Sequence, residues 1–203
     1  NILLDTLAYN THYLGFNANM VANEMFLDSA SLRSSIVSHA KMLGYEVSSC
    51  RSSKATVNVT LTTSNTTATM SAGTAFTAKV DDITYQFVTI ADSTGQNTGS
   101  SIPFDSTEIY EGTWTTTKYL VDTSDVDQRF ILIDNRADTD TLTVKVQNSS
   151  SDTTTTTYTK ATDISQLSST STVYYLQEIE NGKFEVYFGD GVVSKKVSDG
   201  NII

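Results

Sequence analysis

The N-terminal part of the chain carries an apolar pattern with the period of an α-helix. Over residues 1–28, apolar side chains recur at alternating spacings of three and four, and Thr11 fills the one polar gap in the series. This is the spacing of a heptad seam, so it predicts a helix that packs one stripe against a partner. The seam consists of Leu4, Leu7, Leu14, Ala18, Val21 and Met25.

A second, shorter helix is expected after a brief break. Ser29 or Ser31 can cap its start, and its apolar face runs to about Leu43. Gly44 stands where a left-handed C-terminal cap is expected. The two helices would form a hairpin or a bent pair. Two partners for the heptad seam therefore stay open, namely the second helix of the same chain and a neighbouring subunit.

After the helices the apolar residues alternate along the chain, which predicts β-strands. Residues 55–62 alternate strictly, and residues 74–90 have the pattern of a hairpin that turns at Asp81-Asp82. About six strands in this part would suit a small β-sandwich. Residues 93–101 are expected to form a loop, and the other strands to cover residues 109–121, 129–133 and 141–146.

The C-terminal part begins with a polar, low-complexity stretch at residues 148–159, which includes five consecutive threonines, Thr153–Thr157. Such a stretch predicts either a linker or a solvent-facing strand. One helical turn is expected near residues 163–167, and Asn181-Gly182 is a hairpin signal. The remaining strands are expected over residues 172–179, 183–188, 192–197 and 201–203.

The predicted fold class is α+β, because a helical pair precedes predominantly antiparallel β domains, a small β-sandwich and then a β-meander. We expect three segments: a helical assembly segment over residues 1–50, a β-sandwich-like domain over 51–150, and a second β domain over 151–203. Both ends of the chain fall inside apparent elements. The chain is therefore expected to be a fragment of a longer protein, with its second β domain cut at the C-terminus.

The charge of the chain narrows the classes of partner. It has 13 Lys and Arg against 23 Asp and Glu, which gives a formal net charge of −10. Nucleic acids and anionic membranes both need clustered basic residues, so neither is expected as a partner. No apolar run approaches the length of a membrane span. Cys50 is the one cysteine, so the fold does not depend on an internal disulfide.

Residues that could carry catalysis or hold a metal are scarce. His12 and His39 both lie in predicted helices, and neither has a cysteine or carboxylate at the spacing of a metal site. Cys50 has no sequence cue for activation, because a nucleophile needs a base and an orienting group. We therefore expect no catalytic residue, no cofactor and no metal ligand.

Two acidic stretches resemble ligand loops but are better explained as turns. Asp122, Asp125 and Asp127 lie close together, yet they lack the Gly and the downstream Glu of a calcium loop. The Gly-Asp-Gly at residues 189–191 is too short for a phosphate-binding loop and is not followed by a helix. A solvated turn and a hairpin turn are the expected structures.

That Gly-Asp-Gly belongs to a longer pattern that resembles a known family. A strand leads into it, and a second turn of Asp199, Gly200 and Asn201 follows. The pattern resembles the baseplate J-like wedge proteins of T-even-type contractile-tailed phages, and residues 4–45, 73–92 and 121–135 are similar to the same family. The motif residues are Phe188, Gly189, Asp190, Gly191, Gly200 and Asn201.

The resemblance implies structural work without a reaction or a cofactor. Such proteins associate with further copies of themselves and with other wedge proteins, forming a ring around the tail hub that passes on the contraction signal. Contacts with the hub or a sheath initiator fit this role. The resemblance places the chain in the virion, in the tail baseplate, after assembly in the host cytoplasm. One departure is Ser194, which stands where the family usually has a glycine.

Two other classes of function stay open at this stage. A glycan-binding adhesin or fibre module could use Tyr174, Tyr175 and Tyr187 as a sugar platform. A phage-tail hydrolase would need two carboxylates in one cleft, such as Glu178 or Glu185 with Asp190. The helical N-terminus is less typical of adhesin repeats, and strand alternation alone does not exclude the carboxylate pair.

Overall fold

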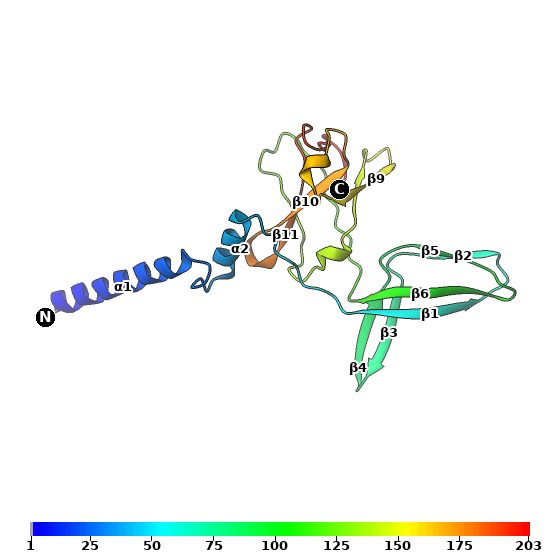
Figure 1. Cartoon of the computed structure of the whole chain (residues 1–203), viewed down its shortest axis with the longest axis horizontal. Coiled ribbons are helices and arrows are strands. Elements are labelled where there is room, and N and C mark those ends of the chain that lie inside the picture. Colours follow the sequence, from blue (N-terminus) through cyan, green and yellow to red (C-terminus); the bar gives the residue numbers. More distant parts are fainter. Residues whose placement is uncertain (1) are drawn as a thin grey trace. The chain divides into compact units, whose positions relative to one another are not determined.

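The computed structural model describes residues 2–203 and divides into two compact units (Figure 1). Unit 1 is built from the segment ending at Ser49, from Leu120–Arg136 and from Val144–Ile203. Unit 2 is built from Cys50–Tyr119 and Ala137–Thr143. The expected α+β class is confirmed, since two helices precede sheets that are mostly antiparallel.

These units cut across the segments expected from the sequence. Residues 120–136 and 144–150 belong to the same unit as the C-terminal strands, although the expected second segment covered 51–150. The chain therefore leaves unit 2, contributes a strand to unit 1, returns briefly and leaves again. The three-segment division stays a prediction about independently folding domains.

The first helix, α1, spans Ile2–Glu24 and has no buried residue. It ends slightly before the predicted limit, because residues 25–29 form turns in place of a further helical turn. The backbone amide of Ala30 donates to the carbonyl oxygen of Phe26, 2.9 Å away, which closes one of these turns. Asn1 lies outside the described residues.

The second helix, α2, spans Arg33–Met42 and confirms one expected cap but not the other. Its N-cap is Leu32, which has no side chain that can cap, so the proposal of Ser29 or Ser31 was wrong. A carboxylate from the preceding helix accepts the free amides instead. At the other end Gly44 has φ +75°, as a left-handed cap requires.

Unit 1 contains a five-stranded sheet with the strand order β7-β11-β10-β9-β8. Only β9 and β10 run parallel. The threonine-rich stretch includes β9, and the threonines of this strand are exposed or half-buried. The alternative of a solvent-facing strand is therefore confirmed, and β9 lies between β8 and β10 in the sheet. The strands are β7 (Phe130–Ile131), β8 (Val144–Gln147), β9 (Thr155–Lys160), β10 (Val173–Glu178) and β11 (Phe184–Phe188).

Two of the expected turns of unit 1 are confirmed, and one expected strand does not form. The expected helical turn is the 3-10 helix Ile164–Gln166, and the hairpin turn between β10 and β11 contains Asn181 and Gly182 at φ 61° and 72°. Residues 192–197 do not form the expected strand. The backbone amide of Lys195 donates to Ser171 in place of a regular ladder.

Most buried apolar side chains of unit 1 lie on one face of its sheet. The ring of Phe188 meets those of Phe130 and Tyr158 edge-on, at centroid distances of 5.9 and 5.3 Å. Such edge contacts add to the area that the rings bury. The buried apolar residues of these strands include Phe130, Val144, Val146, Tyr158, Val173, Tyr174, Leu176, Phe184 and Val186.

Unit 2 contains a four-stranded antiparallel sheet and a separate two-stranded ribbon. The expected hairpin at Asp81-Asp82 is confirmed, since both residues have positive φ and join β3 to β4. The sheet order is β1-β6-β4-β3, with β1 at Lys54–Thr62, β6 at Ser101–Glu111, β4 at Ile83–Val88 and β3 at Ala75–Val80.

Two expectations for unit 2 were wrong. Residues 93–101 are not a plain loop, because Ser93–Gln96 forms β5 and pairs with β2 at Thr67–Met70. The strand predicted over residues 109–121 is also displaced. It is β6, which spans Ser101–Glu111, and residues 113–119 have no regular secondary structure. In the first case a short polar strand gives little periodic signal, so only its partner reveals it.

The β2–β5 ribbon covers part of the apolar face of the sheet. A Cβ added at Gly95 of β5 would clash with the side chain of Ile102 and lie 3.0 Å from the carbonyl oxygen of Pro103. Glycine therefore lets the ribbon backbone approach β6 closely. Ile102 and Phe104 beneath it are buried.

Candidate assembly surfaces

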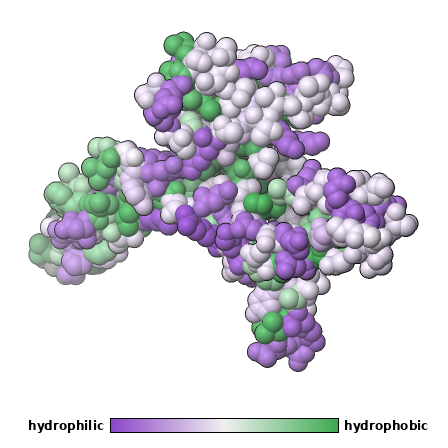
Figure 2. All heavy atoms as spheres, turned by 45° about the vertical axis from the view of Figure 1, so that its right-hand side comes forward, coloured by the Kyte–Doolittle hydropathy of each residue, from purple (hydrophilic) through white to green (hydrophobic). Residues whose placement is uncertain are grey.

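The heptad seam of α1 is exposed along its whole length. On α1, Leu14 is 70% exposed and Val21 66%, and Met25, which lies in the turn just after the helix, is 64% exposed. Within the described residues α2 does not cover this stripe, so the packing of the seam on the second helix of the same chain is not observed. Figure 2 shows the hydrophobic residues gathered on α1, at the left of that view.

A second apolar stripe runs along the other side of α1. It is made of exposed side chains at spacings of seven, four, three and four, and the rings of Tyr9 and Tyr13 lie 5.7 Å apart. With 3.6 residues per turn, this stripe and the seam lie about 150° apart around the helix. The helical spacing of this second stripe is present in the sequence, but the sequence analysis identified only the more regular heptad seam. The members are Ile2, Tyr9, Tyr13, Phe16 and Met20.

The corner between α1 and α2 is fixed by Glu24. Its carboxylate accepts hydrogen bonds from the backbone amides of Ser31, at 2.9 Å, and Leu32, at 3.3 Å. Hydrogen bonds from the hydroxyls of Ser35 and Ser31 lower the pKa of Glu24 to about 2. The carboxylate also meets the positive end of α2, where an anion is favoured.

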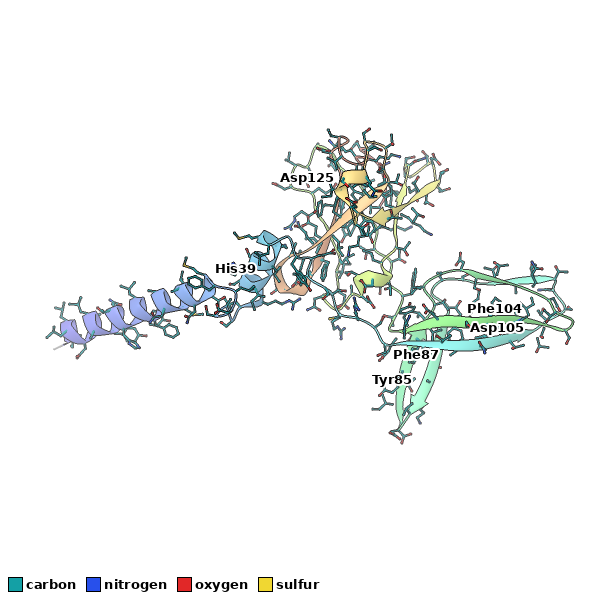
Figure 3. The ribbon with its side chains drawn as sticks, viewed as in Figure 1. His39, Tyr85, Phe87, Phe104, Asp105 and Asp125 are labelled. Carbon is teal, nitrogen blue, oxygen red and sulfur yellow. The ribbon has the colours of Figure 1, made fainter. Side chains whose placement is uncertain are left out.

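His39 is part of this corner, not of a metal site. Its Nε2 donates to the carbonyl oxygen of Glu24 at 2.8 Å, and Figure 3 labels it on α2. His12 lies exposed on α1, and Cys50 is also exposed. Among residues 2–203 no group of three or more His, Cys, Asp or Glu side chains is placed to hold a metal ion.

A buried carboxylate attaches α2 to the sheet of unit 1. Glu178 at the end of β10 is 3% exposed and binds the guanidinium of Arg33 through both oxygens, at 2.7 and 2.9 Å. Lys41, near the other end of α2, donates to the carbonyl oxygen of Glu178. Since Val37 is the one buried side chain that α2 contributes within its described span, these polar contacts hold much of the helix in place.

The second buried carboxylate of this sheet is also paired. Glu185 of β11 binds Arg129, whose Nε lies 2.9 Å from one carboxylate oxygen, and accepts a bond from Gln177. The hydrogen bond from Arg129 is the main cause of a lowered pKa at Glu185, against the raising effect of burial. Both carboxylates are thus structural anions.

The carboxylates proposed for a hydrolase do not come together. Glu185 stands opposite Gln177 in the β10–β11 ladder, so the side chains of Glu178 and Glu185 lie on opposite faces of the sheet. The carboxylate of Asp190 accepts the backbone amides of Val192 and Val193, at 2.9 and 3.3 Å. Each acid has a structural partner, and no shared cleft forms from them.

The Gly-Asp-Gly stretch is a tight turn with one close contact. Gly191 has φ +92° and its amide donates to the carbonyl oxygen of Ser194 at 2.9 Å. Ser194 is fully buried, and a Cβ added at Gly189 would clash with its hydroxyl and lie 2.6 Å from its carbonyl oxygen. The hydroxyl of Tyr175 donates to the Ser194 hydroxyl at 3.3 Å. The serine that departs from the family pattern is therefore accommodated by Gly189.

The second half of the motif closes the edge of the sheet. Gly200 has φ +77° and its amide donates to Val121, while the amide group of Asn201 donates to the carbonyl oxygen of Asn148 at 2.8 Å. The next residue, Ile202, bridges to Gln147 at the end of β8. Both halves of the motif are thus turns, and their contacts hold the C-terminal segment against the sheet of unit 1.

The remaining acidic stretch and the tyrosines are structural as well. Asp122 accepts bonds from the amide and hydroxyl of Ser124, which lower its pKa, and Asp125 accepts the amide of Asp127 at 3.0 Å. These are local turns, and Figure 3 labels Asp125 in an irregular segment. Tyr174 is buried, and Tyr175 and Tyr187 stack on each other, with ring centroids 5.2 Å apart. They do not form a broad exposed platform.

Comparison with known proteins covers both the helices and the C-terminal sheet. Residues 1–45 match the family described as baseplate wedge protein gp6-like, helical domain. Residues 106–203 match the family described as bacteriophage baseplate wedge protein gp6, third domain. Both matched segments belong to gp6-like phage baseplate wedge proteins. This family is structural and not enzymatic, which confirms the expectation that the chain is no enzyme.

One curated relative extends the match over nearly the whole chain. The chain is 29% identical over 205 aligned positions to baseplate wedge protein gp6 of Enterobacteria phage T4. The alignment covers 98% of this chain and 30% of that protein, so the chain spans about a third of the relative's length. The resemblance seen in the sequence is confirmed, and this gp6-like chain is a component of the phage tail baseplate. Within residues 2–203 no helix has the length and apolar character needed to cross a membrane.

Proposed function

We propose that this gp6-like chain assembles the baseplate wedge through α1. The seam of Leu4, Leu7, Leu14, Ala18, Val21 and Met25 would face another copy of the chain or a second wedge protein. The observation that carries this proposal is the exposure of the seam on a helix with no buried residue. A water-exposed stripe of this length costs free energy that a helical partner would recover.

The second stripe of α1 supports a bundle of more than two helices. A helix in a two-stranded coiled coil buries one seam and leaves the other side polar. Here Tyr13 and Phe16, at 55% and 58% exposure, would remain in water if only the first seam were covered. Packing between two neighbouring helices would bury both stripes, as in the interior of a helix bundle.

The same chain would form a ring around the tail hub and relay the signal for contraction. Contacts with the hub or a sheath initiator would belong to that ring. The polar contacts of Glu24 and Glu178 support a relay, because they connect α1 to α2 and α2 to the sheet of unit 1. A movement of the helix bundle would then reach the sheet through defined hydrogen bonds, not through a flexible linker.

Co-expression of the chain with the other wedge proteins of the same phage would test this role. We expect Leu14→Asp and Val21→Asp to reduce the co-purified wedge proteins at least about tenfold, because a charge would be buried in the bundle. Asn17→Asp is the matched control, since Asn17 lies between the two stripes. Unchanged recovery with both seam variants would contradict the proposal.

A further inference from the structure

The outer part of the β3–β4 hairpin in unit 2 has one fully apolar face. Side chains directly opposite each other in the antiparallel ladder lie on the same side of the sheet. The other side carries Thr77, Lys79, Thr84 and Gln86. We call the apolar side the hairpin face, and its cross-strand pairs are Phe76 with Phe87, Ala78 with Tyr85, and Val80 with Ile83.

The hairpin face becomes more exposed toward its tip. Val80 is 55% exposed and Ile83 57%, whereas Phe76, Tyr85 and Phe87 are half-buried. Figure 3 labels Tyr85 and Phe87 on β4, and Figure 2 shows hydrophobic residues on the hairpin that projects downward. Val80 and Ile83 thus leave apolar surface at the tip that the chain itself does not cover, and a partner could bury it.

Strand pairing explains why the hairpin needs a partner. The ladder between β4 and β6 contains only Phe87 with Glu111 and Val88 with Tyr110. Beyond these pairs β3 and β4 continue as a two-stranded ribbon toward Asp81-Asp82 (Figure 1). A two-stranded ribbon is marginally stable in water unless a third strand or another surface covers its apolar side.

Acidic residues flank the hairpin face at both ends. Asp81 and Asp82 form the tip, and Glu111 stands opposite Phe87 at the base, on the same side as the apolar residues. Lys79, on the other side of the ribbon, pairs with Asp82 at 2.7 Å, so the net negative charge at the tip comes from Asp81. The matching surface is therefore apolar in the middle and basic at its ends.

The charges also argue against a second copy of the same hairpin as the occupant. Packed antiparallel, two copies would bring the Asp81-Asp82 tip of one over Glu111 of the other. Packed parallel, they would bring tip against tip. Either arrangement opposes like charges, which disfavours association, and the chain as a whole carries a net charge of −10.

We propose that the hairpin face docks another protein of the baseplate wedge whose apolar surface is flanked by Lys or Arg. The proposal rests on the assembly role given above, but it concerns a surface of unit 2 that is separate from α1. It adds a second contact between this chain and the wedge. It also fixes the orientation of that contact, because the acidic tip of the hairpin faces a basic site on the partner.

Site-specific photo-cross-linking in the co-expressed wedge would test the docking. A photo-reactive amino acid is placed at position 83 in one sample and at position 84 in another, since Ile83 and Thr84 are adjacent, both exposed, and on opposite sides of β4. We expect position 83 to cross-link to a peptide of another wedge protein that contains Lys or Arg beside apolar residues. Position 84 should give at least about tenfold less product.

A matched pair of charge variants measures the contribution of the face to binding. Ile83→Asp should weaken binding of the cross-linked partner at least about tenfold, and Thr84→Asp should change it by less than about twofold. Amide exchange in β6 would show that both variants keep the sheet. Cross-links of equal yield from both positions, or to a second copy of this chain, would overturn the proposal.

The outcomes separate this proposal from the role of α1. If the chain joins the wedge and position 83 gives no cross-link, the hairpin proposal alone is wrong. If the unmodified chain joins no wedge at all, both proposals are wrong. Partial binding by Leu14→Asp that is lost on adding Ile83→Asp would support the second contact.

Discussion

The hydroxyl of Ser194 is fully buried and fixes the residue that can stand at position 189. Because a Cβ at Gly189 would meet both that hydroxyl and the carbonyl oxygen of Ser194, the turn tolerates no side chain there. The conformational freedom of glycine is not the reason at this position. The reason is the close approach of two backbone segments.

Gly189→Ala should therefore destabilise unit 1. We expect a loss of about 1–3 kcal/mol in the free energy of unfolding, because the added methyl overpacks a closed contact. Urea unfolding followed by tyrosine fluorescence would measure it. Gly15→Ala serves as the control, since nothing lies within 4 Å of its added Cβ. It should leave the sheet unchanged and raise the helix content of α1 slightly.

Glu24 makes the corner between the helices sensitive to acid. Its pKa is lowered to about 2 in the folded chain from an ordinary value of 4.5. A lowered carboxyl pKa contributes stability that is present above pH 4.5 and is lost as the pH falls toward 2. We expect the amides of Ser31 and Leu32 to lose protection from hydrogen exchange over this range. In Glu24→Gln they should exchange faster at neutral pH and show little further change with acid.

At the scale of elements, α2 is held to the sheet by charge more than by apolar contact. Removing one partner of a buried pair leaves an uncompensated charge, whereas removing both can be nearly neutral. The side chain of Arg33 is 63% exposed and that of Glu178 only 1%. Loss of Arg33 is therefore the costly change, because it leaves the buried carboxylate of Glu178 without its charged partner.

Arg33→Met should loosen α2 without unfolding the strands. We expect about 1–3 kcal/mol less protection for the amides of α2 in native-state hydrogen exchange, with β10 and β11 unchanged. The double variant Arg33→Met, Glu178→Met should recover part of the loss. Arg136→Met is a control, because the ion pair of Arg136 with Asp134 is exposed. If Arg33→Met and Arg136→Met reduced the protection of the α2 amides equally, the proposed attachment would be contradicted.

At the scale of the whole molecule, two exposed apolar surfaces lie in separate compact units. One is α1 in unit 1 and the other is the hairpin face in unit 2. Independent surfaces should contribute additively to the free energy of assembly. We expect the combined variant Leu14→Asp, Ile83→Asp to reduce wedge recovery by the product of the two single effects, measured by quantitative mass spectrometry. A combined effect no larger than one single effect would show that both act on one contact.

The sequence by itself determined the elements that repeat with a local period. The heptad spacing in α1, the alternation in β1 and the Asp81-Asp82 and Asn181-Gly182 turns were all readable, because each depends on neighbours a few residues apart. The family motif was readable for the same reason. Even the second stripe of α1 was present in the spacing.

Only the tertiary structure decided which distant groups meet. The capping of α2 by Glu24, the attachment of α2 through Glu178 and the contact of Gly189 with Ser194 join residues without a fixed spacing. The same holds for β5, which is a strand only because β2 lies beside it, and for β9, which the polar sequence left between linker and strand. Long-range pairing and burial set these features, and a local pattern does not contain them.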